Sequence, residues 1–154
     1  IAPRAFEYCY NLQRMNPFPN GLVVLDYCAF RECRKLQGRI TIPASIRYVG
    51  NICFQWCESI TSVVFESSST ATTTVLELGD STFEYCCKLR SVRLPNNLTV
   101  IPSNCFHSCS LLIDVPIPGT VQMIRFRAFS YCGALSAVDF LESVIAIDQE
   151  AYLG

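Results

Sequence analysis

The chain of 154 residues repeats one short pattern six times, and this repetition constrains the fold more than any other feature. In each copy a small residue precedes a Phe, a Cys lies three residues after the Phe, and a Leu or Ile lies three residues further on. The phenylalanines are Phe6, Phe30, Phe54, Phe83, Phe106 and Phe129, with spacings of 24, 24, 29, 23 and 23 residues. A period of this length indicates stacked supersecondary units. We therefore expect a solenoid rather than a closed globule.

We interpret residues 1–154 as a single solenoid of about six repeats, followed by a truncated seventh that begins at Ala151. Because the chain begins and ends inside a repeat, we expect it to be part of a longer protein. The third repeat carries a Ser/Thr-rich insertion near 66–74, which we interpret as a surface loop. Such insertions lie on one face of a solenoid and can contact a partner.

The fourth repeat shows how one copy is expected to fold. The alternation in Val92-Arg93-Leu94 predicts a short strand with Arg93 outward, and Pro95 ends it. The segment from Phe83 to Leu89 predicts a single helical or 3-10 turn on the opposite wall. Strands of successive copies should pair in parallel into one continuous sheet. The residue directly after each Phe should face solvent. These residues are Glu7, Arg31, Gln55, Glu84, His107 and Ser130.

This pattern resembles the BspA-like branch of the leucine-rich repeats (type 5), whose consensus combines Ala-Phe-x-x-Cys-x-x-Leu with a later Val-x-Ile-Pro. The resemblance covers nearly the whole chain, although the first strand is irregular around Pro17. It implies an α/β solenoid, mostly β, with short parallel strands and short helical or 3-10 turns on the opposite wall. It also implies a binding or adhesive surface, often in cell-surface proteins of host-associated bacteria and in protists, and it implies no enzymatic activity.

Six of the ten cysteines occupy one repeat position and should form a ladder of buried thiols that donate weakly to backbone carbonyls: Cys9, Cys33, Cys57, Cys86, Cys109 and Cys132. Disulfides remain an alternative, because neighbouring coils would bring Cα atoms to roughly 5 Å. Cys28, Cys53, Cys87 and Cys105 lie outside the ladder. The pairs Cys53/Cys57 and Cys105/Cys109 would lie too far apart to share one zinc ion. We expect no metal and no cofactor.

Composition narrows the classes of function. A net charge of −1 and a pI of about 5.8 leave no basic stripe for nucleic acid. No run approaches the roughly 18 apolar residues of a membrane span. Nucleophilic catalysis with a histidine base would have to use His107, the only histidine, to activate Cys105 or Cys109. The sequence offers no obvious third residue to orient the imidazole. The sequence therefore predicts a protein that is not an enzyme.

Two surfaces are candidates for protein binding. The outward strand positions form a mixed face that is basic in the early repeats and acidic in the late ones: Arg39, Thr41, Ser62, Val64, Ser91, Arg93, Asp114 and Asp139. The second candidate is an aromatic ridge two residues after Phe, formed by Tyr8, Trp56, Tyr85 and Tyr131. A simpler interpretation of the ridge is that it shields the cysteine ladder from water.

We therefore expect a non-enzymatic protein-binding repeat module for adhesion or recognition at a cell surface, either displayed or secreted. The alternative is a structural scaffold or docking subunit of a larger assembly, intracellular or at an organellar membrane, which the low content of charged residues and the aromatic ridge favour. In either case we expect a protein partner, no nucleic acid, and membrane contact only through an assembly or a missing anchor. A glycan partner is also compatible with the sequence.

Overall fold

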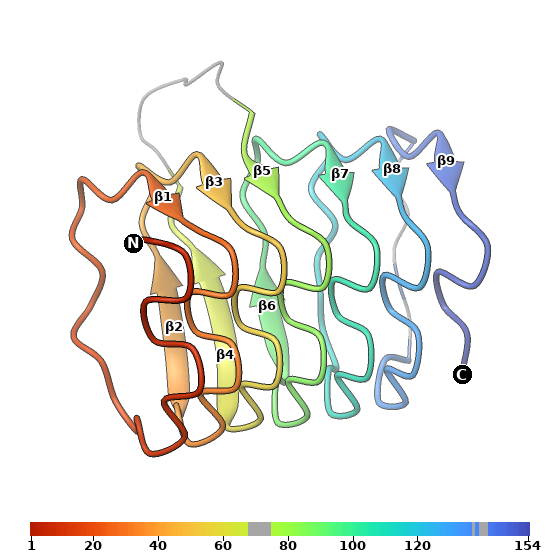
Figure 1. Cartoon of the computed structure of the whole chain (residues 1–154). Helices are drawn as coiled ribbons and strands as arrows, with labels where there is room; N and C mark the ends of the chain where they lie inside the picture. Colours follow the sequence, from red (N-terminus) through yellow and green to blue (C-terminus); the bar gives the residue numbers. More distant parts are fainter. Residues whose placement is uncertain (68–74, 137, 139–141) are drawn as a thin grey trace.

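The computed structural model describes residues 1–67, 75–136, 138 and 142–154. Most of the predicted insertion at 66–74 therefore lies outside the described residues. The chain forms successive coils that progress along one axis from the N-terminus to the C-terminus (Figure 1). This confirms the expected mostly-β solenoid of stacked repeats.

Nine short strands form three parallel sheets of three strands each within the described residues. One sheet contains β1 (Val24–Leu25), β3 (Tyr48–Val49) and β5 (Glu77–Leu78). Another contains β7 (Val100–Ile101), β8 (Met123–Ile124) and β9 (Ala146–Ile147). The third contains β2 (Gly38–Ile42), β4 (Ile60–Phe65) and β6 (Ser91–Arg93). The two sheets that precede the Phe positions were not predicted.

The third sheet, which was expected to be continuous, is interrupted. Within the described residues, only an isolated bridge between Ser91 and Asp114 continues the pairing after β6. Residues 115–118 form no strand, because Pro116 and Pro118 have no N–H to donate to a sheet. The strand expected at 138–140 falls largely outside the described residues.

The wall opposite the third sheet consists of the segments 4–12, 28–36, 52–60, 81–89, 104–112 and 127–135, which we call the turn wall (Figure 1). The described part of the chain contains no helix here, and each predicted helical or 3-10 segment is reduced to single hydrogen-bonded turns. Two residues per coil instead have a positive φ, as in Ile52 (62°) and Trp56 (61°). A left-handed residue on each side of the Phe ends any right-handed helix after a single turn.

The backbone of the turn wall is hydrogen-bonded in an alternating pattern. The Phe54 N–H donates to the Thr82 carbonyl of the next coil at 2.8 Å, and the Trp56 N–H donates to the Glu84 carbonyl at 2.9 Å. The Cys57 N–H donates instead to the Phe54 carbonyl of its own coil at 3.1 Å. Amides therefore bond alternately between coils and within a coil. This pattern satisfies the buried backbone without regular secondary structure.

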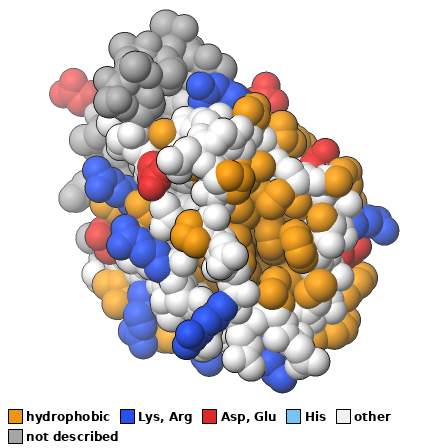
Figure 2. Space-filling view, turned by 90° about the vertical axis from the view of Figure 1, so that its left-hand side faces the viewer, with side chains coloured by type: hydrophobic (Ala, Val, Ile, Leu, Met, Phe, Trp, Pro, Cys, Tyr) orange, Lys and Arg blue, Asp and Glu red, His pale blue; other side chains and the backbone are white. Residues whose placement is uncertain are grey.

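The phenylalanines stack into one column through the core. Successive ring centroids lie 5.0, 5.2, 5.5, 5.7 and 5.3 Å apart, with interplanar angles of 17° or less. Tyr152 of the seventh copy continues the column at 5.1 Å from Phe129. Phe6 is 40% exposed at the N-terminal end, where Figure 2 shows hydrophobic side chains gathered in the middle of the surface. Each coil thus shares its core with its neighbours.

Two glycines allow adjacent coils to approach closely. A Cβ atom added at Gly50 would lie 2.5 Å from the backbone nitrogen of Tyr27. A Cβ atom at Gly79 would collide with the backbone of Gly50 and Asn51. At these positions only hydrogen fits without a backbone shift. This explains why Gly follows the last strand residue, Val49 or Leu78, in the third and fourth repeats.

Candidate protein-binding surface

The predicted rows of outward residues lie side by side on the third sheet. Strand register aligns Arg39 with Ser62 and Ser62 with Ser91, and the isolated bridge adds Asp114 to this row. The second row aligns Thr41, Val64 and Arg93. These residues are exposed or half-buried, whereas the alternate residues Ile40, Val63 and Val92 are buried. We call this surface the strand face: Arg39, Thr41, Ser62, Val64, Ser91, Arg93 and Asp114. The last predicted member, Asp139, lies outside the described residues.

Five cations on and beside the strand face have no ionic partner among the residues that the structure describes. Within the described ranges, no side-chain hydrogen bond or ion pair is formed by Arg14, Arg39, Lys88, Arg90 or Arg93. Figure 2 shows Lys and Arg side chains, with a few Asp and Glu side chains among them, along the left flank and lower edge of the N-terminal end, and the left flank is the side of the third sheet. These five cations therefore carry charge that no ion pair within the described residues neutralises.

A groove borders this surface; it begins between the first coil and β2 and continues past β4 to the fourth coil. Its largest cavity has a volume of about 640 Å³, and it is lined by Arg14, Arg39 and Lys88 together with Met15 and Thr61. A cavity of about 220 Å³ extends the groove at Lys35, and one of about 90 Å³ extends it along residues 15–18. We call these three cavities together the basic groove. Sequence reasoning missed it, although the irregular segment around Pro17 was a signal.

The aromatic ridge is interrupted. Tyr8 and Tyr131 are 44% and 54% exposed, and Trp56 and Tyr85 stack on each other with ring centroids 4.0 Å apart. Glu32 and Ser108 occupy the equivalent positions of the other two coils, so the aromatic side chains form separate groups. Arginine side chains cover two of them, because Arg31 lies 5.5 Å from the Tyr8 ring and Arg34 lies 5.3 Å from the Trp56 ring.

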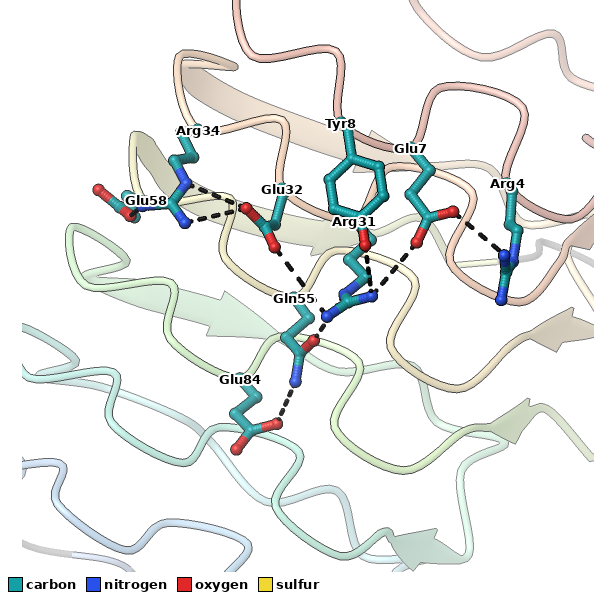
Figure 3. Close-up of polar contacts among 9 residues, drawn as sticks. All are labelled: Arg4, Glu7, Tyr8, Arg31, Glu32, Arg34, Gln55, Glu58 and Glu84. Atoms are coloured by element: carbon teal, nitrogen blue, oxygen red, sulfur yellow. Dashed lines mark hydrogen bonds and ion pairs between the residues drawn. The ribbon is translucent and has the colours of Figure 1, made fainter.

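A polar network links the coils of the turn wall (Figure 3). The Arg31 guanidinium donates to Glu7 at 3.3 Å, to the Tyr8 hydroxyl at 3.0 Å and to Gln55 at 3.1 Å. Gln55 in turn donates to a Glu84 carboxylate oxygen at 2.6 Å. The Glu7 side chain is only 8% exposed. These polar residues, which were expected simply to face solvent, therefore hold neighbouring coils together.

The prediction that His107 faces solvent is wrong. His107 is 8% exposed, and its ring lies edge-on between Tyr85 and Tyr131, with both centroid distances 5.5 Å. Burial lowers the pKa of His107 below its usual value of 6.5. Its buried Nδ1 atom has no hydrogen-bond partner among the described residues. Ser130 at the equivalent position is also buried, and its hydroxyl donates to the Leu153 carbonyl at 3.0 Å.

The cysteine ladder has the predicted geometry. From the second coil onward each ladder thiol donates to the carbonyl of the Phe in the preceding coil, at 3.1–3.3 Å, as in Cys109 to Phe83. All ten cysteines are free thiols. Burial raises the pKa of Cys105 and Cys109 well above the usual value, and it raises that of Cys132 to about 12. Protonated thiols at Cys105 and Cys109 beside a neutral His107 imidazole disfavour nucleophilic chemistry at these residues.

The described residues include no group of three or more His, Cys, Asp or Glu side chains arranged to hold a metal ion. They also include no helix with the length and apolar character needed to cross a membrane.

Comparisons with solved structures show the same architecture. The T. pallidum leucine-rich repeat protein is 26% identical, with a TM-score of 0.81 over 96% of this chain and 65% of that protein. A leucine-rich repeat protein from Eubacterium ventriosum is 23% identical, with a TM-score of 0.83 over 99% of this chain and 39% of that protein. The chain thus spans less than two thirds of either relative. No curated protein matches it.

The repeat pattern itself matches a family model. Six copies of the BspA type leucine rich repeat region match, over residues 1–74 and 40–154. These matches extend along the same coils that carry the phenylalanine column and the cysteine ladder. The chain therefore belongs to the BspA-type leucine-rich repeat family.

Proposed function

We propose that the chain is a non-enzymatic module that binds a partner protein through its strand face, for adhesion or recognition at a cell surface. Leucine-rich repeat proteins are generally protein-binding modules without enzymatic activity, which supports the general class. The observation that carries the choice of surface is the uncompensated charge of Arg39 and Arg93 on an extended, regularly spaced sheet.

The charge pattern of the strand face suggests what the partner presents. Arg39 and Arg93 lie on the first and third strands of the sheet, and Asp114 follows on the coil after them. Complementary charge accelerates association and fixes the orientation of two proteins. The partner should therefore present acidic groups toward the N-terminal coils and a basic group toward Asp114. Thr41, Ser62 and Ser91 between them provide small polar contacts.

The alternative is a docking subunit that uses the aromatic ridge within a larger assembly. The 54% exposure of Tyr131 favours it. Trp56 favours it less, because its ring is already stacked on Tyr85 and covered by Arg34. The two surfaces lie on opposite walls, so a single type of experiment can distinguish them.

Site-specific photo-cross-linking tests the proposal. A benzoylphenylalanine would replace Ser62 or Ser91 on the strand face, and Tyr131 on the ridge. We expect positions 62 and 91 to form an adduct with the same protein from surface extracts of the source organism. The double variant Arg39→Glu/Arg93→Glu should abolish this adduct. Adducts from position 131 alone would favour the docking subunit, and the absence of any adduct would overturn the proposal.

A further inference from the structure

The basic groove offers a binding mode that the flat strand face does not. We propose that it binds an extended acidic segment of the partner, which pairs with the free edge of β2 as an added strand. This inference rests on the proposed function and specifies the chemistry of the partner. Its two supports are the unpaired backbone of β2 and the uncompensated charges around it.

The edge of β2 that faces the first coil is unpaired. β2 pairs with β4 on its other side, where the Glu66 N–H donates to the Ile42 carbonyl at 2.9 Å. Backbone groups alternate in direction along a strand, so those of Arg39 and Thr41 point away from β4, toward the first coil. Within the described residues, no backbone hydrogen bond joins either of them to the first coil. An unpaired edge of this kind can accept a further strand.

The first coil leaves this edge open because its own segment cannot pair there. Residues 14–18 form no strand, and Pro17 has no N–H to donate. The nearest backbone link is at the end of the groove, where the Gln37 N–H donates to the Gln13 carbonyl at 3.1 Å. In Figure 1 the first coil swings away from β2 on its way to β1. The cavity of about 90 Å³ lies between them, and the cavity of about 640 Å³ extends from Arg14 and Met15 across β2 to Thr61 of β4 and Lys88.

The lining of the groove favours an acidic occupant. Arg14, Arg39 and Lys88 line the largest cavity, and the described lining residues of the three cavities include no Asp or Glu. Cations along a groove attract an oppositely charged chain and orient it. Met15 provides an apolar contact at the same place. Because side chains alternate along a strand, a segment of alternating acidic and apolar residues fits best.

A peptide-binding measurement tests this inference. The probe is a fluorescently labelled, end-capped peptide of alternating Glu and Val residues. The groove variant is Arg14→Gln/Lys88→Gln, which leaves the strand face intact. The control is Arg125→Gln/Arg127→Gln, which changes the net charge equally at the other end of the solenoid. We expect the groove variant to weaken binding at least tenfold and the control less than twofold, as measured by fluorescence anisotropy.

A second probe separates strand addition from simple charge attraction. N-methylation of alternate peptide nitrogens removes the N–H groups that would bond β2 but keeps the charges. We expect at least tenfold weaker binding of this peptide, and amide NMR shifts at Arg39 and Thr41 only with the unmethylated peptide. Equal affinities of the two peptides, no binding of the first, or equal loss in both double variants would each overturn the inference. Cross-links from positions 62 and 91 would still support the proposed function in those cases.

Discussion

The turn wall and the strand wall are built from the same repeats but satisfy their polar groups differently. On the turn wall the arginines are ion-paired, as in Arg31 with Glu7 and Arg127 with Glu150, and the ladder thiols from the second coil onward bond a carbonyl. On the strand side Arg39, Arg90 and Arg93 have no such partner within the part of the chain that the structure describes. The turn wall therefore uses its polar groups to hold the coils together, whereas the strand side leaves its cations free to contact a partner.

The largest test of this division concerns the phenylalanine column. Phe83→Ala removes a fully buried ring with stacked neighbours on both sides and leaves a cavity. We expect a loss of about 3–5 kcal/mol in the free energy of unfolding. Arg93→Ala on the strand face should change it by less than about 0.5 kcal/mol. Urea denaturation followed by circular dichroism measures both, and similar losses in the two variants would contradict the division.

The second test concerns the closest approach of two coils. In Gly79→Ala the new methyl group meets the backbone of Gly50 and Asn51, so the backbone must shift. We expect destabilisation by about 1–3 kcal/mol. Gly133→Ala is the matched control, because a Cβ atom there has nothing within 4 Å. Thermal unfolding of both variants checks the difference, and an equal change would show that the coils yield easily at Gly79.

A third, smaller effect is expected from the polar network. Arg31→Met keeps an extended side chain but removes the bonds to Glu7, Tyr8 and Gln55. We expect a loss of about 1 kcal/mol, measured by urea denaturation. Arg90→Met on the strand side removes no such bond within the described ranges and should leave the unfolding midpoint unchanged. If both variants behave alike, the pairing of charges does not distinguish the two walls.

The smallest effect is a pH dependence from His107. Because burial lowers its pKa in the folded state, the unfolded chain binds the proton more readily. The contribution of neutral His107 to stability is complete above 6.5, the usual pKa that applies to the unfolded chain. It is lost as the pH falls from 6.5 through the lower pKa of the folded state. Since the chain has one histidine, its imidazole NMR signals give the folded pKa directly. His107→Phe should remove this part of the pH dependence, and a measured pKa at or above 6.5 would contradict the buried environment.

The repeat period made much of the fold predictable. Equivalent residues in successive coils must lie side by side, so Phe83 and Cys109 could be assigned to a column and a ladder from spacing alone. The same reasoning placed Arg39 beside Ser62 before any register was known. The proposed binding role of these outward residues stays a prediction.

Other features depend on contacts that the period does not encode. The turns at Ile52 and Trp56 have positive φ without Gly, so composition gave no sign that a helix would be excluded. His107 is buried by tyrosines of the coils before and after its own, while Ser108 leaves the space between them. The basic groove exists because residues 14–18 do not pair with β2, and the irregular segment around Pro17 indicated a disturbed strand but not a groove.

The thiol ladder has a consequence for the chemical durability of the protein. A ladder sulfur must lose its proton to attack an oxidant or an alkylating agent, and burial makes that loss costly at Cys57, Cys86 and Cys109. The same proton is engaged with a carbonyl of the coil before. Modification of these sulfurs therefore has to wait for two adjacent coils to separate. The rate at which the middle cysteines react would report directly how often the solenoid opens.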